Sequence, residues 1–359
     1  MKLSIIGLSN SGKTTIFNAL TGMDIETTAY PTTNAEPRRC IVKVPDSRLD
    51  KLSEIFRPRK TTHATIEYVD YIGLTKGDVE QNRKVFDLIK DVDAIVHVDR
   101  AFKDESVVHP LGSVDPLRDA ETIELELIFG DLEFVEKRLN RMEQGLKRGK
   151  KPDESERKLL LKCKNSLGKE IGLRYVEFNE EEHSAMRPLQ FLSTKPEVIV
   201  LNVEEKDLNT DHLNDIQSSI LKMYPFLTVL TMCGKIEMEI ARLSPGDAQL
   251  FLDDLGIKET AANKVIHTCY KLLGLISFFT YVGDEVRAWT MTKGQNAQKA
   301  AGKVHSDIER GFIRAEVISF DDFISAGSIH VAREKGVLRL EGKGYEVDDG
   351  DIINFRFNI

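Results

Sequence analysis

The chain has 359 residues, of which 41% are hydrophobic and 30% charged, a composition typical of globular proteins at a length that accommodates two or three domains. No apolar run reaches transmembrane length, and the opening MKLSIIGLSNSG is interrupted too early by Gly, Ser and Asn to be a secretion signal. Four scattered cysteines without a CxxC pair indicate reduced thiols in a cytoplasmic protein. We therefore expect no disulfide framework, no zinc site and no membrane partner.

The formal net charge of −8 conceals a basic segment. Residues 134–171 contain 12 Lys/Arg against 6 Asp/Glu, a balance of +6 that leaves −14 for the rest of the chain. A basic arm on an acidic body can meet a polyanion without general attraction to it. A solvated helical face is the alternative interpretation of the same charges.

Strand and helix patterns alternate through the first part of the chain. An apolar strand at 3–6 precedes a glycine-rich turn and a helix over 13–20, and further strands are predicted at 65–70, 94–99, 197–202 and 227–232. Strands that alternate with helices favour a mostly parallel sheet covered on both faces. We therefore predict an α/β core.

After about residue 120 this alternation gives way to a coiled-coil pattern. Apolar residues recur there at spacings of 4 and 3: Ile128, Leu132, Val135, Leu139, Met142 and Leu146. The turn sequence GKKPD (149–153) and a less regular helix containing Leu160, Cys163, Leu167 and Ile171 follow. The pattern predicts an antiparallel helical hairpin that carries the basic residues, and a purely structural spur is the alternative.

Short strands and turns begin again at about residue 276 and indicate a separate small α+β domain. We assign residues 1–120 and 190–275 to a discontinuous core, 121–189 to the helical arm, and 276–359 to the C-terminal domain.

The turn after the first strand reads GLSNSGKT (7–14) and matches G-x-x-x-x-G-K-[ST] between a strand and a helix, as this motif requires. Gly7 and Gly12 allow the backbone N–H groups to form a nest around a β-phosphate. Lys13 reaches the β- and γ-phosphates, and the Thr14 hydroxyl completes a Mg²⁺ site. The motif predicts a P-loop that binds a nucleoside triphosphate with Mg²⁺.

A second phosphate sensor is expected at YVDYIG (68–73), which fits D-x-x-G. Asp70 can hold Mg²⁺ through water, and the Gly73 amide can approach the γ-phosphate. Leu74 follows, where many switch GTPases carry the glutamine that orients the attacking water. A leucine forms no hydrogen bond to water, so either the reaction is slow or another group positions the water.

The segment AYPTTNAEP (29–37) is the predicted first switch loop. Thr32, Thr33 and Asn34 are each candidates for the metal, and the sequence does not choose among them. Ordinary turn chemistry explains the same residues.

Asn202 ends the strand EVIVLN, where a guanine-binding protein would read Asn-Lys-x-Asp. Here Val203 takes the lysine position and Glu205 follows in an N-x-x-E pattern, so guanine discrimination is expected to be weak. Adenine presents an N6 donor and an N7 acceptor, and an asparagine amide matches both. With MCGKIE (232–237) as the other wall of the pocket, we expect ATP rather than GTP. An ordinary strand-end asparagine is the alternative.

These segments together resemble one family. GLSNSGKTT, AYPTTNAEP, VDYIGLTKG, LNVEE and CGKIE are similar to the five nucleotide-binding motifs of the Obg-like ATPases, the YchF group. The C-terminal stretches EVRAWT, AAGKVHSDIERGFIRAEVISFDDFI and YEVDDGDIINFRFN resemble the ubiquitin-like TGS domain of that family. The resemblance runs from residue 1 to 359.

The resemblance implies a P-loop NTPase core with an inserted coiled-coil arm and a terminal TGS domain. It also implies ATP binding, slow Mg²⁺-dependent hydrolysis and association with ribosomes. A histidine between core and arm is thought to position water in some members, and His109 in VVHPLGSVDP fits that place. A surface-loop histidine is the commoner alternative.

The motifs and the resemblance together define the expected site. Lys13 and His109 are the expected catalytic residues, and Thr14, Thr33 and Asp70 are the expected metal ligands. The expected nucleotide contacts are Gly7, Asn10, Ser11, Gly12, Lys13, Thr14, Thr15, Gly73, Asn202, Val203, Glu205, Cys233 and Gly234.

The chain also departs from the family pattern. Ser9 and Ser11 replace Pro and Val of the usual GLPNVGKST, which leaves the phosphate cradle intact. Asn34 falls where the family usually has Thr, so Thr33 would have to substitute as the metal ligand. After Gly77 most of the glycine-rich second-switch extension is missing. This shortening bears on switching and hydrolysis rather than on nucleotide binding.

The sequence therefore predicts an ATP-binding, slowly hydrolysing, Mg²⁺-dependent switch protein associated with the ribosome. Residues 280–359 hold 11 Lys/Arg against 13 Asp/Glu, so the basic arm is the better candidate for contact with rRNA. A nucleotide-binding module without hydrolysis and a GTPase with atypical base recognition are the alternatives. A small-molecule kinase is disfavoured because no acceptor site is apparent.

Overall fold

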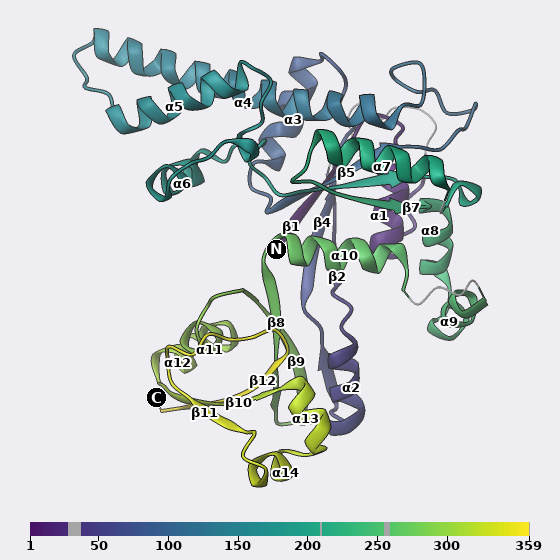
Figure 1. Ribbon diagram of the computed structural model, residues 1–359, viewed down its shortest axis with the longest axis vertical. Coiled ribbons are helices and arrows are strands. Elements are labelled where there is room, and N and C mark those ends of the chain that lie inside the picture. Colours follow the sequence, from purple (N-terminus) through teal and green to yellow (C-terminus); the bar gives the residue numbers. More distant parts are fainter. Residues whose placement is uncertain (28–36, 209, 255–258, 359) are drawn as a thin grey trace. The chain divides into compact units, whose positions relative to one another are not determined.

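The computed structural model describes residues 1–27, 37–208, 210–254 and 259–358. The chain divides into two compact units (Figure 1). The N-terminal unit comprises Met1–Ile41 and Glu67–Val265, and the C-terminal unit comprises Val42–Ile66 and Ile266–Ile359. Thr32, Thr33 and Asn34, the candidates for the metal in the first switch, lie outside the described residues.

A six-stranded sheet in the order β2-β4-β1-β5-β6-β7 forms the centre of the N-terminal unit. Its strands are β1 (Lys2–Ile6), β2 (Arg38–Lys43), β4 (Thr65–Asp70), β5 (Ala94–Arg100), β6 (Glu197–Asn202) and β7 (Thr228–Met232). From β4 through β1, β5 and β6 to β7 every pairing is parallel. The prediction of an α/β core is therefore confirmed. Since parallel strands end at the same edge of a sheet, Asp70 and Asn202 finish on the edge where the turn after β1 lies.

Helices lie between and after these strands in the chain; some pack against the sheet, and others project away from it (Figure 1). They are α1 (Lys13–Thr21), α3 (Val79–Ile89), α4 (Pro116–Lys147), α5 (Glu154–Leu167), α6 (Glu180–Met186), α7 (Asp211–Met223), α8 (Gly234–Arg242), α9 (Pro245–Asp254) and α10 (Ala261–Leu272). None of the helices in the described parts of the chain is both long and apolar enough to cross a membrane.

The arm consists of α4 and α5, which pack on each other through buried apolar side chains. Asp115 caps α4 by accepting from the Arg118 N–H, and Pro116 occupies the first turn, where no backbone donor is needed. The predicted seam is buried at Ile128, Val135 and Leu139 and ends in exposed Leu146. On the second helix, Leu160, Cys163 and Leu167 are buried, whereas Ile171 lies beyond the end of α5 and is exposed.

Buried carboxylates hold the first half of α4 to the core. Glu126 accepts from the Gly77 N–H and from Asn82 Nδ2, both at 2.7 Å. One turn further, Asp131 accepts from the backbone N–H groups of Leu192 and Ser193, both at 2.8 Å. Because hydrogen bonds to ionised groups are roughly twice as strong as neutral ones, the helix is fixed at its base.

A buried ion network reinforces this attachment. Arg174 lies 3.1 Å from Glu124 of α4 and 2.7 Å from Glu197 of β6. Glu197 in turn contacts His97 of β5 at 2.9 Å. Burial alone lowers the pKa of His97, but Asp99 and Glu197 outweigh it and raise this pKa to about 10. The network joins the arm helix to two central strands of the sheet.

The C-terminal unit contains a second six-stranded sheet, in the order β11-β10-β12-β8-β9-β3. Its strands are β3 (Lys60–Thr62), β8 (Leu275–Val282), β9 (Glu285–Thr292), β10 (Phe312–Ser319), β11 (Arg339–Glu341) and β12 (Asp351–Phe357). Its helices are α2 (Ser47–Phe56), α11 (Ala297–Val304), α12 (Ser306–Arg310), α13 (Phe320–Ala326) and α14 (Ile329–Glu334). Strands and helices mix here, as the sequence predicts.

The boundary of the C-terminal unit differs from the predicted one. The sequence analysis placed all of residues 1–120 in the core, but residues 42–66 fold with the C-terminal unit. Phe56 stacks on Tyr281 with ring centroids 4.2 Å apart, and Arg48 forms an ion pair with Asp349 at 2.9 Å. These contacts join residues more than 200 positions apart, so no local pattern indicates them.

Candidate nucleotide site

The P-loop has the backbone that its glycines predict. Gly7 has φ +150° and Gly12 has φ +90°, the latter in the left-handed region that favours glycine. A Cβ on Gly7 would lie 2.3 Å from the Val98 carbonyl oxygen, which no real side chain tolerates. Helix α1 begins directly after Gly12, so its free N–H groups face the loop. This arrangement has the geometry that a bound phosphate group requires.

Lys13 is buried in this loop, with 8% of its surface exposed. Its Nζ donates to the Leu8 carbonyl oxygen at 2.8 Å. Burial lowers the pKa of Lys13 to about 8, and the charge of Asp70 opposes this shift only in part. A negatively charged ligand beside Lys13 would therefore stabilise its protonated ammonium form.

Thr14 and Asp70 meet beside Lys13, although 56 positions separate them in the chain. The Thr14 hydroxyl donates to Asp70 Oδ2 at 3.0 Å, while Asp70 Oδ1 is buried without a hydrogen-bond partner. Burial raises the pKa of Asp70, against the lowering effect of Lys13 and Thr14. A hydroxyl and a carboxylate with an unused oxygen fit Mg²⁺, which takes one or two protein ligands plus phosphate and water. Across the described residues, no group of three or more His, Cys, Asp or Glu gathers to hold a metal by itself.

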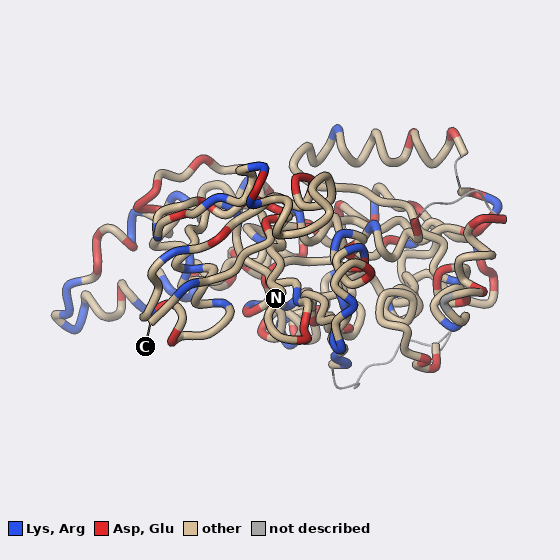
Figure 2. Tube along the Cα trace, turned by 90° about the horizontal axis from the view of Figure 1, so that it is seen from below, with Lys and Arg blue, Asp and Glu red and all other residues tan. Residues whose placement is uncertain are grey.

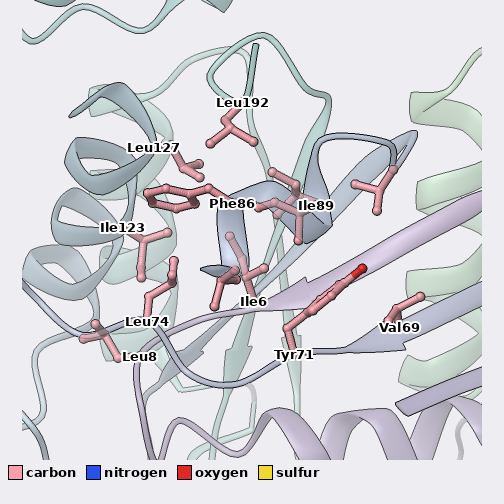
Figure 3. Close-up of a cluster of buried hydrophobic side chains, with 13 residues drawn as sticks. Ile6, Leu8, Val69, Tyr71, Leu74, Phe86, Ile89, Ile123, Leu127 and Leu192 are labelled. Carbon is pink, nitrogen blue, oxygen red and sulfur yellow. The ribbon is translucent and has the colours of Figure 1, made fainter. Parts of the chain in front are cut away.

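Gly73 lies against the P-loop, as expected for a phosphate sensor. A Cβ on Gly73 would lie 2.8 Å from Ser9 Cα, so only glycine allows this approach. Leu74 is fully buried and packs with Ile123 and Leu127 of α4 (Figure 3). Its side chain therefore cannot orient a water molecule at the site.

Gln81 is a polar residue beside Gly73 that the sequence motifs do not indicate. Asp78 caps α3 by accepting from the Gln81 N–H, and Gln81 Nε2 donates to the Gly73 carbonyl oxygen at 3.0 Å. A capping aspartate three residues before a glutamine is the only sequence signal of this geometry.

Asn202 joins three segments of the site. Its Nδ2 donates to the Ser11 carbonyl oxygen at 3.1 Å, and its Oδ1 accepts from the Gly234 N–H at 3.2 Å. A Cβ on Gly12 would lie 2.1 Å from Asn202 Nδ2. The side chain thus connects the P-loop, β6 and the N-terminus of α8, and its contact with adenine stays a prediction.

The remaining expected base contacts lie around this asparagine. Val203 is buried and its N–H donates to the Met232 carbonyl oxygen at 3.0 Å. Cys233 precedes α8 and is buried, which raises the pKa of its thiol. Thr15 approaches Gly234, whose Cβ would lie 3.2 Å from Thr15 Cγ2. Glu205 is exposed at the start of a short 3-10 helix, Glu205–Asp207.

Phe102 is another residue that the sequence analysis missed. Its Cε1 would lie 3.6 Å from a Cβ on Gly12, and the Arg100 guanidinium stacks 4.5 Å from the ring centroid. An isolated aromatic residue after a strand gives no sequence signal of such a position.

His109 lies on a loop that touches the P-loop, but its ring faces elsewhere. Asn10 Nδ2 donates to the Val108 carbonyl oxygen at 2.9 Å. The His109 ring is buried, with Nε2 2.8 Å from Asp119 Oδ2 and Nδ1 accepting from the Leu111 N–H at 3.1 Å. The structure therefore brings the loop, but not the imidazole nitrogens, to the phosphate site.

The low pKa of Lys13 predicts proton uptake when a triphosphate binds. The phosphate charge raises this pKa above its nucleotide-free value of about 8, so affinity is greatest below pH 8 and declines above it, by up to about tenfold per pH unit. Calorimetric titration with an ATP analogue at pH 8, in buffers of different ionisation enthalpy, measures the uptake directly. Lys13→Met is the control that removes it, and equal affinity from pH 7 to 9 without proton uptake would contradict the assignment.

Comparisons with known proteins find relatives along the whole chain. Residues 2–125 match the MMR_HSR1 family, described as a 50S ribosome-binding GTPase, and residues 275–358 match the YchF-GTPase_C family, described as a protein of unknown function (DUF933). The Ribosome-binding ATPase YchF of Bacillus subtilis is 42% identical, over 99% of this chain and 98% of its own. The Ribosome-binding ATPase YchF of Escherichia coli O157:H7 is 40% identical, over 100% and 99%.

A solved structure shows the same arrangement. The Schizosaccharomyces pombe YchF GTPase matches with a TM-score of 0.83 at 28% identity, over 99% of this chain and 97% of its own. The likeness covers both the P-loop core and the C-terminal domain. The chain therefore belongs to the YchF family.

Proposed function

We propose that this chain is an ATP-binding, slowly hydrolysing, Mg²⁺-dependent switch protein that associates with the ribosome in the cytoplasm. The observation that carries the proposal is the hydrogen bond from the half-buried Thr14 hydroxyl to the buried carboxylate of Asp70 beside the P-loop. It occurs in a chain similar along its whole length to proteins named ribosome-binding ATPases.

The phosphate-binding role follows from the residues of the P-loop. Lys13 exchanges its bond to the Leu8 carbonyl for the β- and γ-phosphate oxygens, and the N–H groups at the start of α1 hold the β-phosphate. Thr14 and Asp70 would hold Mg²⁺, which neutralises charge on the β- and γ-phosphates when bound. Gly73, packed against Ser9, directs its N–H toward the γ-phosphate position and senses that group.

ATP is favoured over GTP because the usual guanine-reading groups are absent. Val203 is buried in place of the lysine, and Glu205 takes the place of the aspartate. Asn202 uses one Nδ2 hydrogen and one Oδ1 lone pair within the protein, which leaves one donor and one acceptor. This pair matches N7 and N6 of adenine.

Hydrolysis is proposed to be slow because the second switch lacks a side chain for the attacking water. Leu74 is buried, and His109 is the residue proposed to position water in its place. In the arrangement described above both of its ring nitrogens are engaged. The imidazole must therefore move before it can act.

Phosphate release measured with Mg²⁺ and ATP tests the enzymatic proposal. Lys13→Ala removes the ammonium group proposed to bind the β- and γ-phosphates, so we expect a loss of turnover of about 100-fold or more. Lys84→Ala, an exposed lysine on α3, is the control and should retain the rate. If wild type and Lys13→Ala release phosphate at the same rate, the chain is a nucleotide-binding module without hydrolysis.

A GTPase is the second candidate function, because the Schizosaccharomyces pombe relative carries that name. The same assay with GTP in place of ATP separates the two proposals. If kcat/KM is higher for GTP than for ATP, GTP takes the place of ATP as the proposed substrate.

For the partner, we propose that α4 and α5 form a coiled-coil arm whose tip contacts rRNA. We also propose that the C-terminal unit is a TGS-like domain. Lys and Arg positions, coloured blue along the Cα trace, gather at the tip of the arm (Figure 2). The exposed ones are Arg141, Lys147, Arg148, Lys150, Lys151 and Lys158. A cluster of this kind binds phosphates in a salt-dependent manner.

Replacing Lys147, Arg148, Lys150 and Lys151 by Ala tests this partner. Ribosome cosedimentation at increasing salt concentration should show weaker binding by this variant. The slope of the logarithm of the binding constant against the logarithm of the salt concentration should be smaller by about one for each phosphate contact removed. The control replaces exposed lysines elsewhere, namely Lys51, Lys84, Lys222 and Lys299. An unchanged slope in the arm variant would exclude the arm as the RNA contact.

A further inference from the structure

His109 is held in a position where both ring nitrogens are hydrogen-bonded, and neither of these bonds is to the P-loop. Its Nδ1 accepts from the Leu111 N–H at 3.1 Å, so the neutral ring carries its proton on Nε2. That proton is donated to Asp119 Oδ2 at 2.8 Å. A group that activates water needs a free nitrogen lone pair, and the ring has none in this position.

Asp119 is itself fixed by several contacts. It lies in the first turn of α4 and is 1% exposed. Its second oxygen, Oδ1, accepts from Arg118 Nε at 3.1 Å and from Arg118 Nη2 at 2.7 Å. Arg118 is in turn bound to the Ser113 hydroxyl at 2.9 Å. The contacts with Arg118 thus hold the Asp119 carboxylate in the orientation in which it accepts from His109.

The helix that carries Asp119 is also bound to the second switch. Two turns after Asp119, Glu126 accepts from the Gly77 N–H and from Asn82 Nδ2. The loop that carries His109 is joined to the P-loop on its other side, where Asn10 donates to the Val108 carbonyl. The backbone of residue 108 is therefore bonded to the P-loop, while the side chain of the next residue is bonded to α4.

We propose that Asp119 is a positioning residue that stores His109 in an inactive orientation, and that breaking this contact releases the imidazole toward the nucleotide. The inference rests on the proposed function, since it assigns His109 to hydrolysis. In this proposal turnover is slow because the His109 imidazole is held by Asp119, and not only because Leu74 replaces a glutamine. The arm helix supplies the holding residue.

Single-turnover hydrolysis at saturating Mg²⁺ and ATP tests the proposal in the full-length protein. Asp119→Ala leaves Nε2 without its acceptor and should raise the rate by about tenfold or more, because a bond to a charged acceptor shifts a two-state equilibrium at least that far. Asp119→Asn, whose amide oxygen still accepts, should give a smaller increase. ATP affinity should stay the same in both variants, and Glu121→Ala, an exposed glutamate on the same helix, should leave the rate unchanged.

The double variant His109→Ala/Asp119→Ala must lose the increase, since it removes the group that is released. Three results would overturn the proposal: a rate that falls in Asp119→Ala, an increase that persists in the double variant, or no turnover in any variant. The first would mean that Asp119 orients an active histidine. Loss of turnover in Lys13→Ala tests the proposed function separately from these comparisons.

A spectroscopic measurement tests the stored position without depending on a variant at Asp119. Long-range ¹H–¹⁵N spectra of the histidine side chains distinguish the two neutral tautomers, and His109→Ala identifies the signals among the 8 histidines. We expect the wild-type ring to be protonated on Nε2 and unprotonated on Nδ1. A proton on Nδ1, or rapid exchange between both forms, would overturn the stored geometry.

Discussion

Asn202 occupies the space that Gly12 leaves open beside the P-loop. A Cβ at Gly12 would stand 2.1 Å from Asn202 Nδ2, so the asparagine can reach the Ser11 carbonyl only because residue 12 has no side chain. Its other end accepts from the Gly234 N–H. One buried amide therefore fixes the phosphate loop, the end of β6 and the start of α8 relative to one another. Every proposed contact to a nucleotide depends on this arrangement.

The second feature that organises the N-terminal unit is the row of acidic residues along α4. Asp119 binds His109, Glu126 binds the segment after Gly73, and Glu124 joins the buried ion network of the sheet. Removing one partner of the buried ion pair between Glu124 and Arg174 costs about 3–5 kcal/mol, because it leaves an uncompensated charge. A helix that carries the basic arm at one end thus holds the parts of the phosphate site at the other.

The sequence predicted those parts of the structure that depend on local patterns. Hydrophobic runs located the strands that end at Asp70 and Asn202, and the spacing of glycines located the P-loop. The contact between Thr14 and Asp70 is expected because the P-loop follows β1, and Asp70 ends the neighbouring parallel strand β4. Each of these predictions depends on a few neighbouring residues.

Other features depend on tertiary contacts that no local pattern encodes. The site for residues 42–66 is set by Phe56 against Tyr281, and the orientation of His109 is set by Asp119 of α4. Gln81 donates to the Gly73 carbonyl oxygen, a contact between a helix and the preceding loop that no local pattern predicts. The bracing role of Asn202 was likewise hidden, since a strand-end amide gives the same pattern whether it binds a base or a backbone.

The central claim is that this P-loop site selects ATP. The most direct measurement is calorimetric titration of the protein with Mg²⁺ and non-hydrolysable analogues of ATP and GTP. The account predicts that the ATP analogue binds at least about tenfold more tightly, a difference of about 1.4 kcal/mol. Equal affinity, or tighter binding of the GTP analogue, would contradict the base-pocket assignment and return the chain to the guanine-nucleotide switches.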